Sequence, residues 1–176
     1  MALNLINLDA VTRKYMLDKI ESDERAGRLY ISSRLSNRGA SDYPALLKAA
    51  ATAADDSFLA NELRAPGRLN PTEPRNTKNG VTWAKVPITA PETMAEGEFN
   101  RFYARGLCRR AIDEGKPKVR VYRAKQVMNP RSLSEALLGQ LFEAEKLLED
   151  LRVHIGTDTS LGLPDGPNSG LSICLP

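Results

Sequence analysis

Apolar residues recur at helical spacing in several parts of the chain. Met16 and Ile20 lie on one face of a segment in which Asp9 is placed to cap the first turn and Gly27 to end the last. This pattern predicts a helix over residues 9–24. Shorter segments with comparable apolar spacing and polar or acidic starts predict three further helices, over residues 41–54, 55–64 and 143–152.

A longer helix is predicted over residues 89–114. Thr89 and Glu92 have the Thr-x-x-Glu spacing of a capping box, and Gly115 follows as a stop. We expect one side of this helix to face the core; that side carries Tyr103, Leu107, Cys108 and Ala111. Gly106 lies among them and has no side chain beyond hydrogen, which indicates that another element packs closely against the helix at this point.

Strand-like segments are shorter. The alternation of Val119 and Val121 with polar neighbours predicts a strand over residues 118–125. Residues 81–88 resemble a strand that Pro87 either ends or confines to a sheet edge. Three other segments are less definite: residues 29–33 as a short strand or an extended piece, residues 171–175 as a final extended piece, and residues 136–142 as a helix broken at Gly139 or a short strand.

Polar, proline-rich and glycine-rich segments separate these elements. We predict a turn at residues 37–40, a long polar loop over about residues 65–80, and an extended, turn-rich tail over about residues 156–176. The pattern as a whole predicts one α+β domain, residues 1–176, in which a small mixed or antiparallel sheet packs with four to five helices.

Composition is typical of a folded globular protein. The 176 residues are 41% hydrophobic and 27% charged, which argues against disorder. The start of the chain has no basic segment followed by an apolar one, so no signal peptide is predicted, and no apolar run approaches the roughly 18 residues of a membrane span. Cys108 and Cys174 are too few and too far apart to indicate a disulfide framework, so we expect a reduced, cytoplasm-type protein without a membrane partner.

Catalytic motifs are not evident. His154 is the single histidine, which excludes the zinc motifs that can be read from sequence, and its position between Val153 and Ile155 favours a structural role. No Gly-x-Ser-x-Gly is present, and the glycine-rich segment 162–170 has no lysine and contains prolines that remove amide donors a phosphate loop needs. We therefore expect a protein that is not an enzyme, with no catalytic residue, cofactor or metal site.

The most unusual feature is the basic segment, residues 99–125. It contains nine basic and two acidic residues, a net charge of +7, whereas the whole chain carries +3, so the remainder is net −4. The residues proposed to form an interface or bind phosphate are Arg101, Arg105, Arg109, Arg110, Lys118, Arg120 and Arg123. The first three follow an i, i+4, i+8 stripe on the predicted helix.

Three interpretations of the basic segment remain open. Its cations can pair with carboxylates of the same chain, such as Glu98 and Asp113, or remain solvated. They can bind an acidic protein surface or a second copy of the chain. They can also bind nucleic-acid phosphates, with nearby aromatic residues stacking on bases; the aromatic residues available are Phe99, Phe102, Tyr103 and Tyr122.

The tail offers a second candidate interface. Residues 171–175 alternate apolar and small residues, so they can form an edge strand in their own domain or add a strand to a neighbouring subunit. In the second case Leu171, Ile173 and Leu175 are the interface residues. That interpretation also expects that a chain lacking residues 171–176 assembles poorly while the monomer stays folded.

Two strings carry a resemblance: Gly97-Glu-Phe-Asn-Arg-Phe-Tyr-Ala-Arg-Gly-Leu-Cys-Arg-Arg-Ala-Ile-Asp-Glu-Gly, and Val121-Tyr-Arg-Ala-Lys. With the 147–152 helix and the 167–172 ending, the chain resembles small proteins encoded in tailed-phage and related metagenomic genomes. This resemblance implies a setting and assigns no residue a role. It points to a virion structural protein of the head-decoration or head–tail connector type, assembled in the host cytoplasm with other virion proteins or copies of itself. The alternative is a small nucleic-acid-binding or regulatory phage protein that is cytoplasmic.

Overall fold

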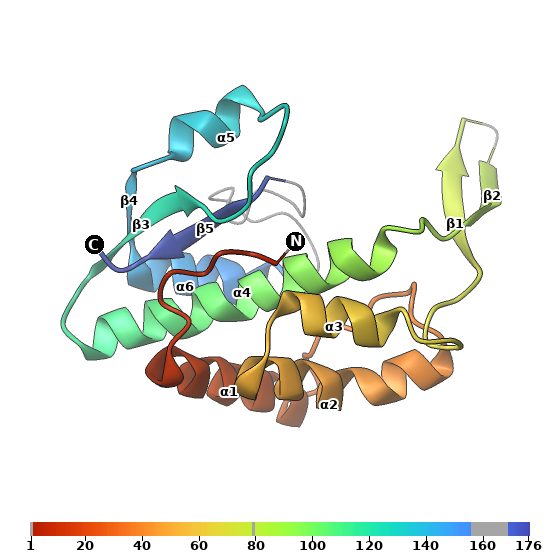
Figure 1. Ribbon diagram of the computed structural model, residues 1–176, viewed down its shortest axis with the longest axis horizontal. Coiled ribbons are helices and arrows are strands. Elements are labelled where there is room, and N and C mark those ends of the chain that lie inside the picture. Colours follow the sequence, from red (N-terminus) through yellow and green to blue (C-terminus); the bar gives the residue numbers. More distant parts are fainter. Residues whose placement is uncertain (1, 79, 156–168) are drawn as a thin grey trace.

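The computed structural model describes residues 2–78, 80–155 and 169–176. The chain has an α+β fold, as predicted, and the described residues include six helices and five strands (Figure 1). In chain order these are α1 Ala10–Arg25, α2 Asn37–Ala53, α3 Asp56–Leu63, β1 Thr72–Thr77, β2 Gly80–Lys85, α4 Ala90–Asp113, β3 Lys118–Arg123, α5 Ser132–Leu137, β4 Leu141–Glu143, α6 Ala144–Val153 and β5 Leu171–Cys174. The tail over residues 156–168, predicted to be turn-rich, lies outside the described residues.

Helix α4 is the centre of the fold. Figure 1 shows α1, α2 and α3 on one side of α4 and the sheet of β3, β4 and β5 on the other. The buried core draws on both sides and includes Phe99 and Leu107 of α4 and Val121 of β3. Gly106 lies where α1 crosses α4, as its lack of a side chain predicts. A Cβ atom at this position would lie 2.8 Å from the Met16 amide nitrogen, so only glycine allows the two helices to approach this closely.

The first helix follows its prediction, whereas α2 begins earlier than predicted. Asp9 caps α1 by accepting a hydrogen bond from the Thr12 amide. Residues 37–40, predicted to be a turn, instead form the first turn of α2, because the Ser36 hydroxyl caps the helix by accepting a hydrogen bond from the Gly39 amide at 3.0 Å. Gly39 also packs against the chain beyond α3, where a Cβ would lie 2.0 Å from the Arg68 carbonyl oxygen.

The predicted polar loop over residues 65–80 is wrong for its second half. Thr72–Thr77 forms β1 and pairs antiparallel with β2, so that residues 72–85 make a hairpin that projects from the body of the molecule, which we call the hairpin arm (Figure 1). Strand β1 has the sequence Thr-Glu-Pro-Arg-Asn-Thr, which has little strand propensity, and its extended conformation comes from its pairing with β2. Residues 29–33 are the extended piece and not a strand.

The three-stranded sheet has the order β4-β3-β5, with both pairings antiparallel. The alternation predicted for β3 is confirmed, since Val119 and Val121 are buried and Lys118 and Arg120 are exposed. Residues 136–142, predicted to be either a helix broken at Gly139 or a short strand, contain parts of both. Helix α5 ends at Leu137 and strand β4 begins at Leu141, and between them Gly139 takes a left-handed backbone conformation with φ of 78°. Strand β5, formed by the predicted extended piece 171–175, lies at one edge of this sheet and pairs with β3 of the same chain.

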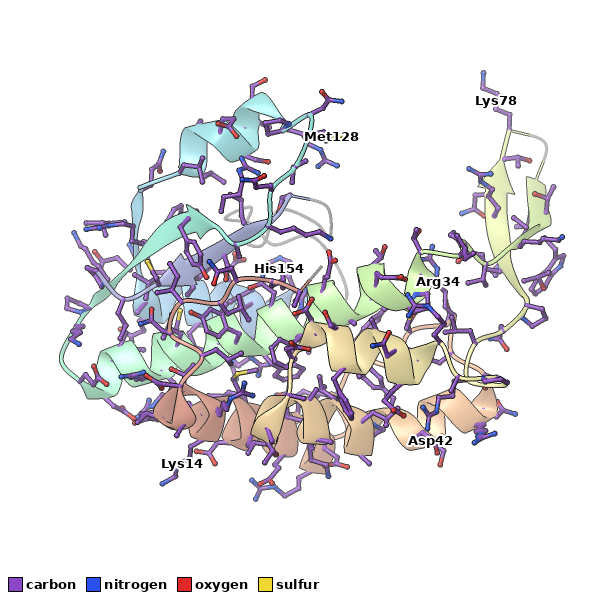
Figure 2. All side chains as sticks on the ribbon, in the orientation of Figure 1. Lys14, Arg34, Asp42, Lys78, Met128 and His154 are labelled. Atoms are coloured by element: carbon purple, nitrogen blue, oxygen red, sulfur yellow. The ribbon has the colours of Figure 1, made fainter. Side chains whose placement is uncertain are left out.

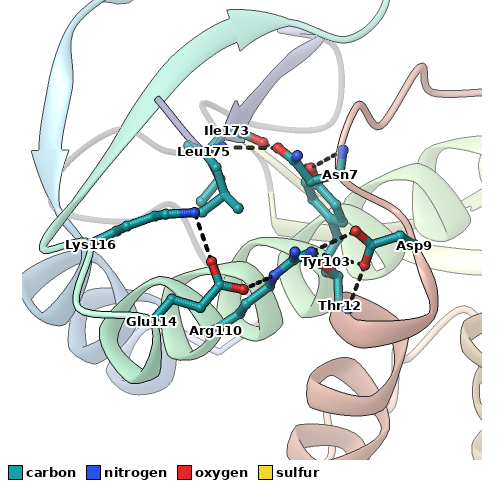
Figure 3. A network of polar contacts seen from close by, with 9 residues as sticks. All are labelled: Asn7, Asp9, Thr12, Tyr103, Arg110, Glu114, Lys116, Ile173 and Leu175. Atoms are coloured by element: carbon teal, nitrogen blue, oxygen red, sulfur yellow. Dashed lines mark hydrogen bonds and ion pairs between the residues drawn. The ribbon is translucent and has the colours of Figure 1, made fainter.

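A polar network joins the two termini to α4 (Figure 3). The Tyr103 hydroxyl donates to the Ile173 carbonyl of β5 and accepts from the Asn7 amide, and the Asn7 side chain accepts from the Leu175 amide. Arg110 binds the Asp9 carboxylate, so the start of α1 is attached to the same face of α4. Residues from both ends of the sequence thus depend on one segment of α4 for their positions.

Candidate functional site

The arginine stripe of α4 does not form an open basic surface. Arg105 lies within the helical packing, with a side chain only 3% exposed, and its two terminal nitrogens bind the two carboxylate oxygens of Asp23 at 2.5 and 2.9 Å. Asp23, on α1, is 4% exposed, so this is a buried bidentate ion pair. The Arg105 guanidinium also lies 5.0 Å from the centre of the Phe102 ring.

Arg101 is buried one turn earlier and binds the end of α6. Its Nε lies 3.4 Å from Glu98, and its Nη1 donates to the backbone carbonyls of Leu151 and His154. The carbonyl end of a helix attracts a cation, so Arg101 attaches the C-terminus of α6 to α4. Burial raises the pKa of Glu98, and the opposing charges of Arg101 and Arg105 limit that increase.

The last turn of α4 is more exposed. Arg109 pairs with Asp113 at 2.7 Å, one turn along the same helix, and Arg110 binds Glu114 and Asp9 (Figure 3). Burial alone would raise the pKa of Asp9, but its hydrogen bonds from Thr12 and Arg110 outweigh that effect and lower the pKa. Arg109 therefore stabilises its own helix, whereas Arg110 also attaches the start of α1 to α4.

The cations of β3 also have partners, with one exception. Lys118 lies 3.6 Å from Glu143 on the neighbouring strand β4, and Arg123 binds Glu135 of α5 and the Ser169 carbonyl. Arg120 is exposed and has no ion pair within the described residues. Six of the seven predicted interface residues are therefore engaged within the chain, which agrees with the intrachain interpretation of the basic segment.

Three of the four aromatic residues predicted to stack are not available to a ligand. Phe99, Phe102 and Tyr103 are buried in the core, because they lie on the side of α4 that faces the other helices and the sheet. Tyr122 is half-buried, and its hydroxyl donates to the Asn4 carbonyl and accepts from the Ile6 amide. The expectation that these rings stack on bases is wrong for the three α4 residues.

The tail residues also pack within the chain. Leu171 and Ile173 are buried on β5, and α4 holds this strand through Asn100, whose side chain donates to the Leu171 carbonyl at 2.8 Å. Leu175 is partly buried and donates its amide to Asn7. The intrachain alternative for the tail therefore holds, and the expectation that the monomer stays folded without residues 171–176 conflicts with this burial.

Titratable and thiol groups elsewhere are packed into the fold. The His154 Nδ1 lies 2.9 Å from a carboxylate oxygen of Asp150, one turn earlier on α6. Cys108 and Cys174 are both free, and burial raises the pKa of each thiol. Within the described residues no group of three or more His, Cys, Asp or Glu side chains is placed to hold a metal ion, and no helix is long and apolar enough to cross a membrane.

The hairpin arm is the feature that the sequence interpretation missed. Its largest apolar side chains are exposed, Trp83 to 73% and Val81 to 64%. Alternation places these two side chains on one face of β2, and Trp83 lies directly opposite Pro74 of β1. The dipeptide Asn79-Gly80 is a common hairpin signal, and here it comes directly before the apolar Val-Thr-Trp segment. That signal predicts a turn near residue 80, although the register pairs Gly80 with Thr77 and so places Gly80 within β2; it does not by itself identify β1.

The charges of the hairpin arm are mostly unpaired. Arg75, Lys78 and Lys85 have no ion pair within the described part of the chain, and Figure 2 shows Lys78 at the tip, far from the body of the molecule. The single carboxylate of the hairpin arm, Glu73, is bound by Arg34 at its base, at 2.5 and 3.1 Å. The hairpin arm therefore presents cations and exposed apolar side chains together.

A hollow of about 300 Å³ lies at the base of the hairpin arm. Its lining combines polar and apolar surface, and its apolar residues include Leu63, Leu69, Pro71, Val86, Ile88 and Pro91. Ile88 follows β2 directly and is itself highly exposed. Val86 and Ile88, which line the hollow, thus follow β2 within three residues of its last residue, Lys85. No protein-family model, curated protein or solved structure matches the chain.

Proposed function

We propose that the protein is a non-enzymatic structural component of a phage-type virion, of the head-decoration or head–tail connector type, which binds neighbouring virion proteins through the hairpin arm. The observation that carries this proposal is the exposure of Trp83 and Val81 on an element that projects from the body. Tryptophan is among the residues that contribute most to protein interfaces. The resemblance of residues 97–115 to small phage-encoded proteins supports the virion setting.

The isolation of the hairpin arm also supports a binding role. A two-stranded hairpin is marginally stable in water by itself, and three or more strands or packing against a helix are generally needed. The hairpin arm has only its two strands and shares its sheet with no other strand of the described residues. Contact with a partner would cover the exposed apolar face and stabilise the element.

The second candidate is a nucleic-acid-binding protein. The basic segment offers few free charges for this role, because most of its cations have carboxylate partners within the chain. The unpaired Arg75, Lys78 and Lys85 of the hairpin arm are the observation that favours it, since phosphate contacts come mainly from such side chains. This candidate expects binding to duplex or single-stranded DNA that weakens steeply as the salt concentration rises.

The test is co-sedimentation with capsid shells assembled from the capsid protein of the genome that encodes the chain. The control variant replaces residues 72–85 with a Gly-Gly turn, which the structure permits because the Val86 amide already donates to the Pro71 carbonyl at 3.1 Å. We expect the full chain to sediment with the shells and the variant to stay in solution while remaining folded, with an unfolding temperature lowered only slightly by loss of the Arg34–Glu73 ion pair. Failure of the full chain to bind, together with salt-sensitive DNA binding, would replace the proposal with the second candidate.

A further inference from the structure

The hydrogen-bonding phase of the hairpin arm determines which backbone groups point outward. In an antiparallel ladder, directly opposed residues alternate between pairs that exchange hydrogen bonds and pairs that do not. The bond from the Val86 amide to the Pro71 carbonyl identifies these two residues as a bonded pair just below the ladder. Counting from there along the register, the bonded pairs are 73 with 84, 75 with 82, and 77 with 80. The residues between them direct their amides and carbonyls away from the partner strand.

The two edges of the hairpin arm differ for this reason. Pro74 occupies an outward position of β1 and has no amide hydrogen, so the β1 edge lacks a donor at its middle. The outward positions of β2 are Val81, Trp83 and Lys85, whose amides and carbonyls pair with no other strand of the described residues. The β1 edge is therefore protected against pairing, and the β2 edge is open along its length.

The side chains of the β2 edge define what would pair there. Val81, Trp83 and Lys85 share one face, which is thus apolar along most of β2 and ends in a cation. Lys85, Arg75 and Lys78 have no ion pair within the described residues. The one carboxylate of the hairpin arm, that of Glu73, is bound to Arg34. A second copy of the chain would bring the same cations against these, and like charges oppose such pairing.

We propose that the β2 edge binds an extended segment of a partner protein, rich in acidic residues that alternate with apolar ones, as a third strand. This inference rests on the proposed function and specifies its contact. The backbone of the segment would pair with the outward groups of Val81, Trp83 and Lys85, its apolar side chains would cover Trp83, and its carboxylates would lie near Lys85 and Lys78. Main-chain pairing of this kind supplies affinity, and the side chains on alternate positions supply specificity.

Fluorescence anisotropy of short labelled peptides tests the inference with the full chain. One peptide set alternates Glu with Val, and a matched set has Lys in place of Glu. We expect the Glu set to bind and the Lys set not to bind. We expect Trp83→Ala to weaken binding of the Glu set about thirtyfold, the loss typical of a central interface tryptophan. Equal binding of both sets, or tighter binding of a duplex DNA oligonucleotide than of the Glu set, would overturn the inference.

Two proline substitutions separate the edges. Val81→Pro removes an outward amide from β2, and Asn76→Pro removes the outward amide of the residue directly opposite on β1. Neither amide takes part in the ladder between the two strands, so the two variants are matched. We expect Val81→Pro to abolish peptide binding, Asn76→Pro to retain it, and Val81→Ala, the side-chain control, to weaken it only in part. Loss in both proline variants or in neither would contradict pairing at the β2 edge.

Amide hydrogen exchange gives a second measurement that does not depend on a variant. Addition of the Glu peptide should slow exchange of the Val81, Trp83 and Lys85 amides and leave that of Asn76 unchanged. No change at the three β2 amides would overturn the inference. One outcome separates this inference from the proposed function. If the wild-type chain binds capsid shells, the chain lacking residues 72–85 does not bind them, and the wild-type chain does not bind the Glu peptide, then the inference fails and the proposed function stands. If the wild-type chain binds neither, both fail.

Discussion

Arg105 and Arg109 lie one turn apart on α4 and have the same side chain, but the structure gives them different roles. Substituting Arg105→Ala leaves the Asp23 carboxylate, 4% exposed, without its cation, and breaking a buried ion pair in this way costs about 3–5 kcal/mol. Arg109→Ala removes a pair with Asp113 in which the side chains are 46% and 33% exposed, and such a pair contributes about 0.3–0.5 kcal/mol. The free energy of unfolding should separate the two variants clearly.

Urea unfolding followed by far-ultraviolet circular dichroism measures the difference. With a slope of about 2 kcal/mol per molar urea, typical of a small domain, Arg105→Ala should lower the midpoint by about 1.5–2.5 M and Arg109→Ala by about 0.2 M. The double variant Asp23→Ala/Arg105→Ala should lose less stability than the sum of the two single variants, because each single change already breaks the pair. A midpoint for Arg105→Ala equal to that of Arg109→Ala would refute the assignment of Arg105 to the folded core.

Three further predictions concern packing, pH and the C-terminus. Gly106→Ala should destabilise the protein by about 1–3 kcal/mol in thermal unfolding, because its Cβ would clash with Met16. Gly97→Ala on the same helix, with no atom within 4 Å of its Cβ, should instead gain about 0.5–1 kcal/mol. Burial raises the pKa of Asp56, so the folded chain holds that proton more tightly than the unfolded chain. The stability of the wild type relative to Asp56→Asn should therefore fall as the pH rises above 3.8, measured by urea unfolding across pH. Deleting residues 171–176 should leave a chain without a cooperative unfolding transition, because Leu171 and Ile173 are core residues; a folded truncated monomer would contradict this.

Local signals in the sequence predicted most of the helices and two of the strands. Asp9 and Asp55 cap their helices as predicted, each by accepting a hydrogen bond from the amide three residues later. The capping box predicted at Thr89 is wrong, since Thr89 makes no side-chain cap hydrogen bond and Glu92 binds Arg64 instead. The α+β class followed from these elements. The start of α2 was missed because Ser36 acts as its cap in a segment that resembles a turn. Strand β1 was missed because it is polar and contains Pro74, and its conformation depends on pairing with β2.

The candidate site was harder to predict for a physical reason. Helical spacing places Arg101, Arg105 and Arg109 on one stripe, but it does not determine which way the stripe faces. That depends on partners distant in sequence: Asp23 lies 82 residues before Arg105 and comes from another helix. The basic segment does carry an excess of positive charge. The carboxylates that neutralise most of that charge are spread over the rest of the chain.

The central claim is that the hairpin arm, and not the basic segment, makes the contact with a partner. Co-sedimentation with capsid shells tests it most directly when two variants are compared, Trp83→Ala on the hairpin arm and Arg120→Glu on the basic segment. Arg120 is exposed, so its substitution should leave the fold intact. We predict that Trp83→Ala loses binding to the shells while Arg120→Glu binds as the wild type does. Normal binding by Trp83→Ala, with loss in Arg120→Glu, would contradict the account.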